Sequence, residues 1–360
     1  MKNKEKRLMR GSEAIGEAAV RAGCACYFGY PITPQNELTE YMARRMMETG
    51  RVFLQSESEI AAINMSLGAA STGVRVMTSS SSPGISLKQE GISFIAAMEL
   101  PCVIVNIVRG GPGLGNIAPA QSDYFQATRG GGHGDYRTIV LAPGSVQELY
   151  DLTRKSFELA DEYRTPVLVL ADGMLGQMME PVVFNDKEIL PEQLPDKPWT
   201  VKGAKDRPSR FIRSLLLDVD VEEEQNWRLY RKYQRIERRE IRYEEYYMKG
   251  AELAIVAYGT AARIAKAAVK RCVEKNMRVG LIRPISLWPF PYEHIYKTAE
   301  TVKHFMSFEM STGQMVEDVQ LGVKGRAEVL MYGRPGGVVP TPAELFRVIS
   351  RAYNKIAREK

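Results

Sequence analysis

The first 185 residues alternate between two patterns of apolar positions. One pattern has apolar residues at helical spacing, and it predicts amphipathic helices at 11–22, 36–49, 59–72 and 86–99. The other is a short, continuously apolar run, and it predicts buried strands at 26–29, 51–54, 74–78, 102–108 and 167–171. This alternation favours an α/β fold with a doubly wound parallel sheet. Ser12 is expected to cap the first helix.

The alternation of predicted helices and strands stops between residues 185 and 250. Prolines open this stretch, and a charged segment rich in Tyr, Arg and Glu follows them. The composition predicts a connector with a surface helix at 191–250, between a first domain at 1–190 and a second at 251–360. The second domain repeats the α/β pattern, with a predicted helix at 261–275 and predicted strands at 253–257, 279–282, 301–308 and 327–330.

Charge is spread along the chain rather than concentrated in one tail. The 49 Lys and Arg residues exceed the 43 Asp and Glu residues, which gives a net charge of +6. Basic residues gather at 225–250 with glutamates between them, so we interpret this stretch as solvated helix surface, with a docking surface as the alternative. We expect no nucleic-acid partner. The chain has no apolar run of membrane-spanning length, and its charged N-terminus lacks the apolar core of a signal peptide, so we expect no membrane association and a cytoplasmic location.

The four cysteines predict no metal site in this chain. Cys24 and Cys26 are two positions apart, whereas zinc and iron–sulfur ligands usually have two residues between them, and no second pair exists. Cys102 lies in an apolar run, which is typical of a small buried side chain. We therefore expect reduced structural thiols, Cys272 included, and no iron–sulfur cluster here.

Two segments after predicted strands carry polar groups where α/β proteins bind ligands. At 29–36, two prolines stiffen a loop that holds Thr33 in a set position, although a rigid turn without a ligand is the alternative. At 55–62, Glu57 and Glu59 precede an alanine-rich helix. These carboxylates either interact with the helix dipole or lie in a cleft, where one could hold a proton or bind a basic ring nitrogen.

Two further candidates lie in glycine-rich loops. Arg109 follows a buried strand, and its guanidinium suits the bidentate binding of a small carboxylate. His133 lies among glycines and is either a proton shuttle or part of a flexible loop. The chain lacks a Gly-Asp-Gly followed by a distant Asn, the pattern that binds magnesium and a diphosphate in thiamine enzymes; Asp172-Gly173 has no preceding glycine.

Six stretches together resemble the alpha subunit of 2-oxoacid:ferredoxin oxidoreductases, and most closely its 2-oxoisovalerate (3-methyl-2-oxobutanoate) branch. They lie at 30–34, 55–62, 77–84, 109–112, 121–123 and 171–179. The likeness covers 10–185 and, less closely, 250–350. It implies that the first domain is the pyrimidine-binding domain of thiamine-diphosphate enzymes and that the second resembles the C-terminal domain of transketolase.

The resemblance also implies cofactors and partners. In this family thiamine diphosphate is shared with a beta subunit that holds the diphosphate and Mg²⁺, which accounts for the missing Gly-Asp-Gly pattern. A gamma subunit and a ferredoxin-like delta subunit with [4Fe-4S] clusters complete the enzyme, and ferredoxin receives the electrons. The implied reaction is the coenzyme A-dependent oxidative decarboxylation of a 2-oxoacid to acyl-CoA and CO₂.

Residue roles are carried over from the matching motifs. The glutamate that binds N1′ of the aminopyrimidine corresponds to Glu59, because Gly68 follows nine positions later as in other thiamine enzymes. Glu57 is the alternative, since the Gln-Ser-Glu match to pyruvate-using relatives favours it. Thr33 and Arg109 would hold the oxo and carboxylate groups of the substrate. The resemblance further suggests substrate contacts from Tyr30, Pro31 and Ile32, cofactor contacts from Ser81, Ser82 and Pro83, and a cleft lined by Gln121, Asp123 and His133.

Position 118 bears on the substrate. Relatives that use 2-oxoglutarate carry a threonine nine residues after the arginine, whereas this chain has Ala118, which favours an apolar, branched-chain substrate. Several alternatives stay open: pyruvate or 2-oxoglutarate as substrate, a non-catalytic binding or scaffold subunit, and a transketolase-like transferase half. Reduction of a viologen dye separates the oxidoreductase from the transferase.

Overall fold

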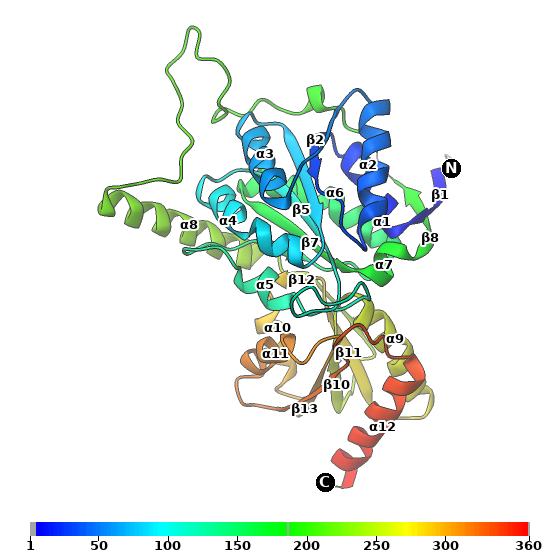
Figure 1. Ribbon diagram of the computed structural model, residues 1–360. Coiled ribbons are helices and arrows are strands. Elements are labelled where there is room, and N and C mark those ends of the chain that lie inside the picture. The colour runs from blue at the N-terminus through cyan, green and yellow to red at the C-terminus, as the bar shows by residue number, and fades with distance from the viewer. Residues whose placement is uncertain (1–4, 186, 359–360) are drawn as a thin grey trace.

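The computed structural model describes residues 5–185 and 187–358. The described chain forms two large β-sheets, each with helices on both faces, and the sheets lie one below the other (Figure 1). The first half of the chain builds most of the upper sheet and the last third builds most of the lower one (Figure 1). The prediction of an α/β fold with a doubly wound parallel sheet is confirmed.

The larger sheet has seven strands: β2 (Cys24–Gly29), β3 (Val52–Gln55), β4 (Arg75–Ser80), β5 (Cys102–Val108), β6 (Ile139–Leu141), β7 (Pro166–Asp172) and β12 (Ser286–Trp288). Their order across the sheet is β12-β6-β7-β5-β4-β2-β3, and all neighbours are parallel except β12 and β6. Every residue of β4, β5 and β7 is buried. This explains why β5 and β7 have nearly continuous apolar sequences rather than alternating ones.

Helices cover both faces of this sheet. One face carries α1 (Gly11–Arg21), α2 (Asn36–Glu48) and α6 (Val146–Tyr163), and the other carries α3 (Glu59–Ser71) and α4 (Pro83–Ala97) (Figure 1). Shorter helices follow β5 and β7, namely α5 (Tyr124–Arg129) and α7 (Gly173–Gln177). The expected cap of α1 is wrong, because Arg10 holds the N-cap position and Ser12 is fully buried inside the first turn.

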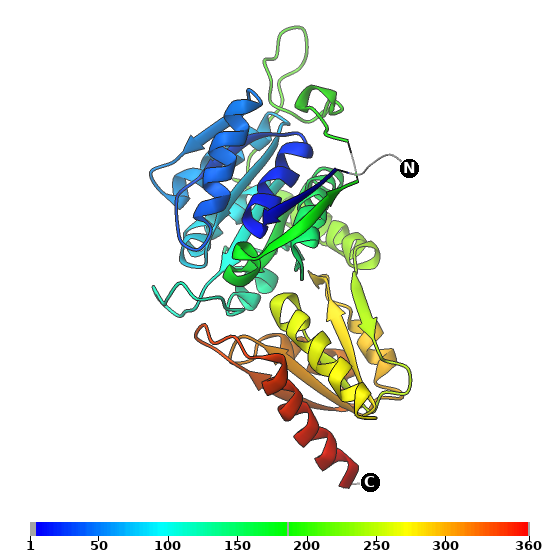
Figure 2. The same ribbon diagram turned by 90° about the vertical axis from the view of Figure 1, so that its right-hand side faces the viewer.

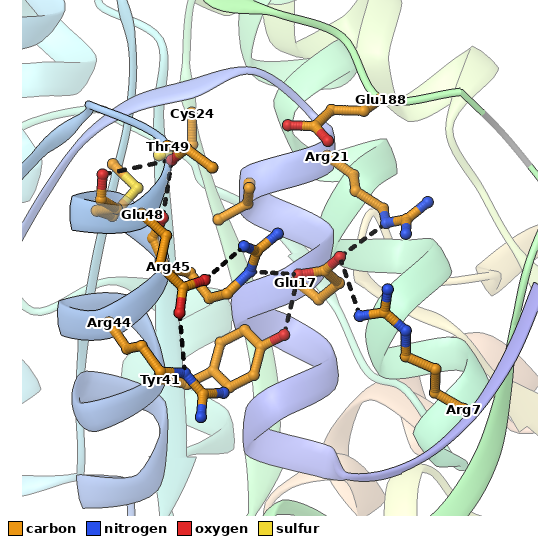
Figure 3. A network of polar contacts seen from close by, with 12 residues as sticks. Arg7, Glu17, Arg21, Cys24, Tyr41, Arg44, Arg45, Glu48, Thr49 and Glu188 are labelled. Atoms are coloured by element: carbon orange, nitrogen blue, oxygen red, sulfur yellow. Dashed lines mark hydrogen bonds and ion pairs between the residues drawn. The ribbon is translucent and has the colours of Figure 1, made fainter.

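An ionic network joins α1 to α2 (Figure 3). Glu17 is 1% exposed and accepts hydrogen bonds from Arg21 Nε (2.8 Å), Arg45 Nε (3.1 Å) and the Tyr41 hydroxyl (2.9 Å). Burial alone would raise the pKa of Glu17, but these donors and the charge of Arg45 outweigh it, so the pKa lies below its usual value. An antiparallel pair, β1 (Glu5–Arg10) and β8 (Met179–Phe184), borders this network (Figure 2).

The smaller sheet has the order β14-β13-β10-β11-β9. Its strands are β9 (Tyr243–Tyr246), β10 (Leu253–Val256), β11 (Val279–Pro284), β13 (His304–Glu309) and β14 (Glu328–Gly333). One face carries α9 (Gly259–Glu274) and α12 (Pro342–Arg358), which lie side by side in Figure 2, and the other carries α10 (Tyr292–Thr298) and α11 (Met315–Val323). The four strands predicted after residue 250 are all present.

The two sheets exchange strands at their boundary. β9 lies inside the expected connector but pairs with β11, and β12 lies inside the expected second domain but pairs with β6 of the larger sheet. The connector contains the predicted surface helix, α8 (Val219–Arg239), and also a 3₁₀ turn (Pro191–Gln193) that was not predicted. Among the described helices, none combines the length and apolar character that crossing a membrane requires.

Candidate active site

The candidate site lies at the carboxyl ends of β2, β4 and β5. The loop after β5 runs between the two sheets, where Asn116 Nδ2 donates to the Gly336 carbonyl (3.0 Å) and Gln121 Nε2 donates to the Tyr258 carbonyl (2.9 Å). Ligands of open α/β sheets bind at this edge, outside the carboxyl ends of the strands. The arrangement places the candidate residues where ligand chemistry is expected.

The two candidate carboxylates have opposite environments. Glu59 is the first residue of α3 and is 5% exposed, whereas Glu57 lies in the preceding bend and is exposed. Ser58 caps α3 by accepting a hydrogen bond from Ala61 N (3.2 Å), which fixes the direction in which the helix begins. The structure therefore gives different surroundings to the preferred glutamate, Glu59, and to its alternative, Glu57.

Glu59 packs directly against the start of α4. A Cβ atom on Gly84 would lie 2.5 Å from Glu59 Oε1 and 2.0 Å from Ser80 Oγ, so only glycine leaves room for this approach. Within the described parts of the chain, no hydrogen bond to the Glu59 carboxylate is found, although its charge acts to raise the pKa of Lys88. A buried carboxylate in this state is suited to a ligand that brings its own donor.

The turn after β4, Ser80-Ser81-Ser82, which we call the serine turn, also contains polar groups without hydrogen-bond partners in the described part of the chain. The hydroxyls of Ser80 and Ser81 are fully buried and have no partner among the described residues. Ser82 has a left-handed backbone (φ 24°, ψ −82°) and is followed by Pro83, the first residue of α4. Strained non-glycine backbone and unpaired buried hydroxyls cluster at ligand sites. The turn thus presents polar groups beside Glu59.

A second network holds this turn in place. Asn106 on β5 accepts a hydrogen bond from Ser82 N (3.0 Å) and donates one to Asp123 Oδ2 (2.8 Å). Burial raises the pKa of Asp123, while hydrogen bonds from Ser82 and Asn106 oppose that rise. Asp123 therefore lies beside the serine turn, as part of its support.

Arg109 and Thr33 meet at the other side of the site. Arg109 is 6% exposed, and its Nη1 donates to the Thr33 carbonyl (2.9 Å) while its Nη2 donates to the Leu114 carbonyl (3.1 Å). Its Nε is buried and has no partner among the described residues. The two loops therefore fix the guanidinium plane and leave donors available to a carboxylate.

The other expected site residues are more scattered. Tyr30 and Pro31 are exposed on the loop after β2, and Ile32 is half-buried. Ala118 packs against Gly337, in the loop after β14 of the smaller sheet, since a Cβ on Gly337 would be 2.5 Å from the Cβ of Ala118. His133 is exposed beside Ser93 and the connector, toward the far end of α4 from Gly84, so the structure does not bring it to Glu59.

Gln121 joins the two halves of the molecule instead of presenting its amide to a ligand. Besides its bond to Tyr258, its Oε1 accepts a hydrogen bond from Met310 N (3.0 Å), and it is 3% exposed. Asp172 likewise caps α7 by accepting hydrogen bonds from Met174 N and Leu175 N. The residues that the structure describes contain no cluster of three or more metal-binding side chains.

Two residues of this region were missed from the sequence: Asn106, which holds the serine turn, and Lys88 on α4. Asn106 is the one polar residue in the strand sequence CVIVNIV, and that interruption is a signal that could have identified it. Lys88 occurs four residues after Gly84, so a helix that starts at Pro83 would have placed both on one face. The predicted helix began at residue 86 and hid this relationship.

Comparison with known families agrees with this geometry. The family described as pyruvate flavodoxin/ferredoxin oxidoreductase, thiamine diphosphate-binding, matches residues 17–249. The pyruvate:ferredoxin oxidoreductase core domain II matches residues 251–345. The chain therefore belongs to the 2-oxoacid:ferredoxin oxidoreductases, enzymes that depend on thiamine diphosphate, and it is a subunit of one.

Curated relatives cover nearly the whole chain. The ketoisovalerate oxidoreductase subunit VorB of Methanothermobacter marburgensis is 51% identical over 95% of this chain and 96% of its own length. The 2-oxoglutarate synthase subunit KorA of Methanocaldococcus jannaschii is 38% identical over 95% of this chain and 98% of its own length. The expectation of a 2-oxoacid:ferredoxin oxidoreductase subunit is confirmed.

Solved structures support the same fold. The 2-oxoglutarate:ferredoxin oxidoreductase from Magnetococcus marinus, with 2-oxoglutarate, coenzyme A and succinyl-CoA bound, superimposes with a TM-score of 0.85 at 25% identity. The match covers 98% of this chain and 66% of that chain, so this chain spans about two thirds of that one. A split-gene transketolase shares the fold, with a TM-score of 0.58 at 15% identity.

Proposed function

We propose that this chain supplies the pyrimidine-binding half of the active site in a coenzyme A-dependent 2-oxoisovalerate:ferredoxin oxidoreductase. One observation carries the proposal: Glu59 is only 5% exposed at the carboxyl edge of the sheet, and no hydrogen bond to its carboxylate is found in the described part of the chain. A buried carboxylate without a donor is unfavourable. The N1′ position of the cofactor's aminopyrimidine is a site that can supply one.

The residues beside Glu59 fit a bound aminopyrimidine. Thiamine diphosphate, when bound, supplies the nucleophilic carbon and the electron sink for decarboxylation. Glu59 holds and exchanges the proton at N1′, as a positioned carboxylate can. The unpartnered hydroxyls of Ser80 and Ser81 offer hydrogen bonds to polar atoms of the ring, and Ser82 with Pro83 forms the adjoining wall. Glu57 is exposed, so we assign the role to Glu59.

The substrate carboxylate belongs at Arg109. Its guanidinium is held in place by the carbonyls of Thr33 and Leu114, which leaves Nε and further Nη hydrogens to form charge-assisted bonds. The Thr33 hydroxyl accepts a bond from Asn36 Nδ2 (3.4 Å) and keeps its own hydrogen for an oxo group. Ala118 offers no polar partner to a second carboxylate, which favours a branched apolar substrate.

The relatives' names favour the same substrate branch. Those called ketoisovalerate oxidoreductase subunits are 51–52% identical to this chain, whereas those called 2-oxoglutarate synthase subunits are 35–38% identical. We accordingly propose 2-oxoisovalerate as the substrate, with coenzyme A as the acyl acceptor. The solved relative contains coenzyme A, which supports a place for it in this family.

A partner subunit completes the site in this proposal. The partner holds the diphosphate and Mg²⁺, and further subunits carry the [4Fe-4S] clusters. Three cysteines here are buried and Cys26 is half-buried, an arrangement unsuited to cluster ligation. Exposed apolar side chains surround the site, with Ile60 49% exposed on α3, Leu87 50% on α4 and Leu114 80% on the loop after β5. Such a surface is typical of one that another chain covers.

The test is an anaerobic viologen-reduction assay on the complex purified through this subunit. Coenzyme A, thiamine diphosphate and Mg²⁺ are supplied with 2-oxoisovalerate, pyruvate or 2-oxoglutarate in turn. Dye reduction that is strongest with 2-oxoisovalerate, lost in Glu59→Gln and retained in the exposed control Glu57→Gln is expected. Dye reduction with none of the three acids would overturn the proposal, and strongest reduction with another acid would reassign the substrate.

A further inference from the structure

Lys88 is a lysine without exposed surface in the middle of the larger domain. It lies on α4 and is 0% exposed, which is rare for a lysine unless it is paired. Its Nζ donates to Thr78 Oγ1 (2.6 Å) and to the Ser79 carbonyl (3.0 Å), both on β4. These partners are neutral, so the hydrogen bonds do not cancel an ammonium charge.

The packing of α3 against α4 brings Glu59 to the helix face that carries Lys88. Two glycines of α4 allow the close approach: a Cβ on Gly84 would lie 2.5 Å from Glu59 Oε1, and one on Gly91 would lie 2.5 Å from Ile63 Cγ2. Lys88 is four residues after Gly84 and three before Gly91, so it shares their face of the helix. Long side chains on helices point back toward the N-terminus, which for Lys88 is the Gly84 and Glu59 end.

Two titratable groups act on Lys88 from the elements packed around it. They are the carboxylate of Glu59 on α3 and the thiol of Cys102 on β5. Burial raises the pKa of Cys102 to about 12, so the thiol is uncharged near neutral pH. Burial also lowers the pKa of Lys88 to about 7, against the opposing effect of the Glu59 charge. Lys88 therefore carries its charge near and below neutral pH, and Glu59 is the anion that counterbalances that charge.

We propose that Lys88 is a positioning residue that acts on the cofactor through Glu59, because its ammonium charge favours the ionised carboxylate and so keeps the shared proton on N1′ of the aminopyrimidine. This inference rests on the proposed role of Glu59. A buried positive charge lowers the proton affinity of a nearby carboxylate. Lys88 thereby sets how readily Glu59 and N1′ exchange a proton, without touching cofactor or substrate.

The experiment measures the near-ultraviolet circular dichroism of thiamine diphosphate bound to the purified complex, without substrate, as pH is varied across neutrality. The variants are Lys88→Met, Glu59→Gln and the double variant. Lys232→Met, on α8, is the matched control. The Lys232 side chain is also largely buried (8% exposed), and burial lowers its pKa to about 8. It differs from Lys88 in that its partner is Glu99. Lys88→Gln keeps a donor for Thr78 and Ser79 without the charge.

We expect Lys88→Met and Lys88→Gln to move the pH transition of the cofactor signal upward by about one unit or more, because the positive charge is lost. Lys232→Met is expected to titrate like the unmodified complex. In the Glu59→Gln background Lys88→Met should add no further shift. An unshifted transition in both Lys88 variants, or an equal shift with and without Glu59, would overturn the inference.

The same data separate this inference from the proposed function. If Glu59→Gln leaves the cofactor's titration unchanged, the assignment of Glu59 is wrong and the role of Lys88 falls with it. If Glu59→Gln abolishes the transition while both Lys88 variants leave it in place, only the role of Lys88 is wrong. Thermal unfolding of each complex identifies a variant that has failed to fold, in which case the other Lys88 variant decides.

Discussion

The Cβ position of Gly84 lies 2.5 Å from Oε1 of Glu59 and 2.0 Å from Oγ of Ser80. A glycine early in a helix costs up to about 1 kcal/mol relative to alanine, so Gly84→Ala would stabilise an ordinary helix. Here the added methyl group must displace the Glu59 carboxylate. We expect the affinity for thiamine diphosphate to fall by about tenfold to 100-fold, because small misplacements of a positioned group have effects of that size.

The measurement for Gly84→Ala is the concentration of thiamine diphosphate that restores dye reduction to the cofactor-free complex. Gly203→Ala is a suitable control, since a Cβ there meets nothing within 4 Å. The control should bind the cofactor like the unmodified complex. Equal cofactor affinity in Gly84→Ala would show that the contact between Gly84 and Glu59 does not limit binding.

The network around Glu17 should make stability depend on pH. Hydrogen bonds and the charge of Arg45 hold the pKa of this buried carboxylate below 4.5 in the folded state, in spite of burial. A depressed folded-state pKa means that the carboxylate stabilises the fold above its unfolded-state pKa. This contribution is lost as pH falls below 4.5 and through the lower folded-state value.

Glu17→Gln removes the charge while the arginines remain, so we expect a loss of about 3 kcal/mol in the free energy of unfolding at neutral pH. Chemical denaturation at neutral pH and below pH 4.5 measures it, and the variant should lose less stability on acidification than the unmodified chain. The exposed Glu40→Gln serves as the control, with an expected change within about 0.5 kcal/mol. Equal acid sensitivity in Glu17→Gln and the unmodified chain would argue against the network.

Gln121 is expected to stabilise the contact between the two halves of the molecule rather than to bind substrate. Gln121→Leu leaves the Tyr258 carbonyl and the Met310 amide without their side-chain partner, and unpaired buried polar groups cost about 1–3 kcal/mol each. We expect a lower free energy of unfolding and faster hydrogen exchange at Met310, with KM for the 2-oxoacid nearly unchanged. The exposed Gln320→Leu is the control. A large rise in KM without loss of stability would instead place Gln121 in the substrate cleft.

Elements whose apolar pattern is continuous or helical could be predicted from the sequence. The strand at 102–108 agrees with β5, and the helix at 59–72 agrees with α3 to within one residue, because burial of whole faces determines both patterns. β9 and β12 could not be predicted in the same way. β9 has the sequence YEEY and alternates between exposed and partly buried residues at a sheet edge, and β12 joins a sheet whose other strands come from the first half of the chain.

The site was predictable only in part, for a related reason. Glu59 begins a predicted helix and Arg109 directly follows a predicted strand, and the structure buries both residues. The spacing to Gly68 favoured Glu59 over Glu57, but the burial of Glu59 depends on the direction of α3, which Ser58 sets by capping the helix. Lys88 was missed because its environment depends on how α3 packs against α4, a tertiary contact that one helix's sequence does not reveal.

Ala118 offers a test of substrate choice. Ala118→Thr introduces a hydroxyl that can pair with a second carboxylate, so we expect the ratio of kcat/KM for 2-oxoglutarate over 2-oxoisovalerate to rise by about tenfold or more. Ala118→Val is the matched control, because valine has nearly the shape of threonine without the hydroxyl, and both side chains meet the same crowding from Gly337. Steady-state dye reduction with both acids gives the ratio. A rise in this ratio in Ala118→Thr alone would assign the effect to the hydroxyl. Equal changes in both variants would assign the effect to crowding, and position 118 would then have no polar role in substrate recognition.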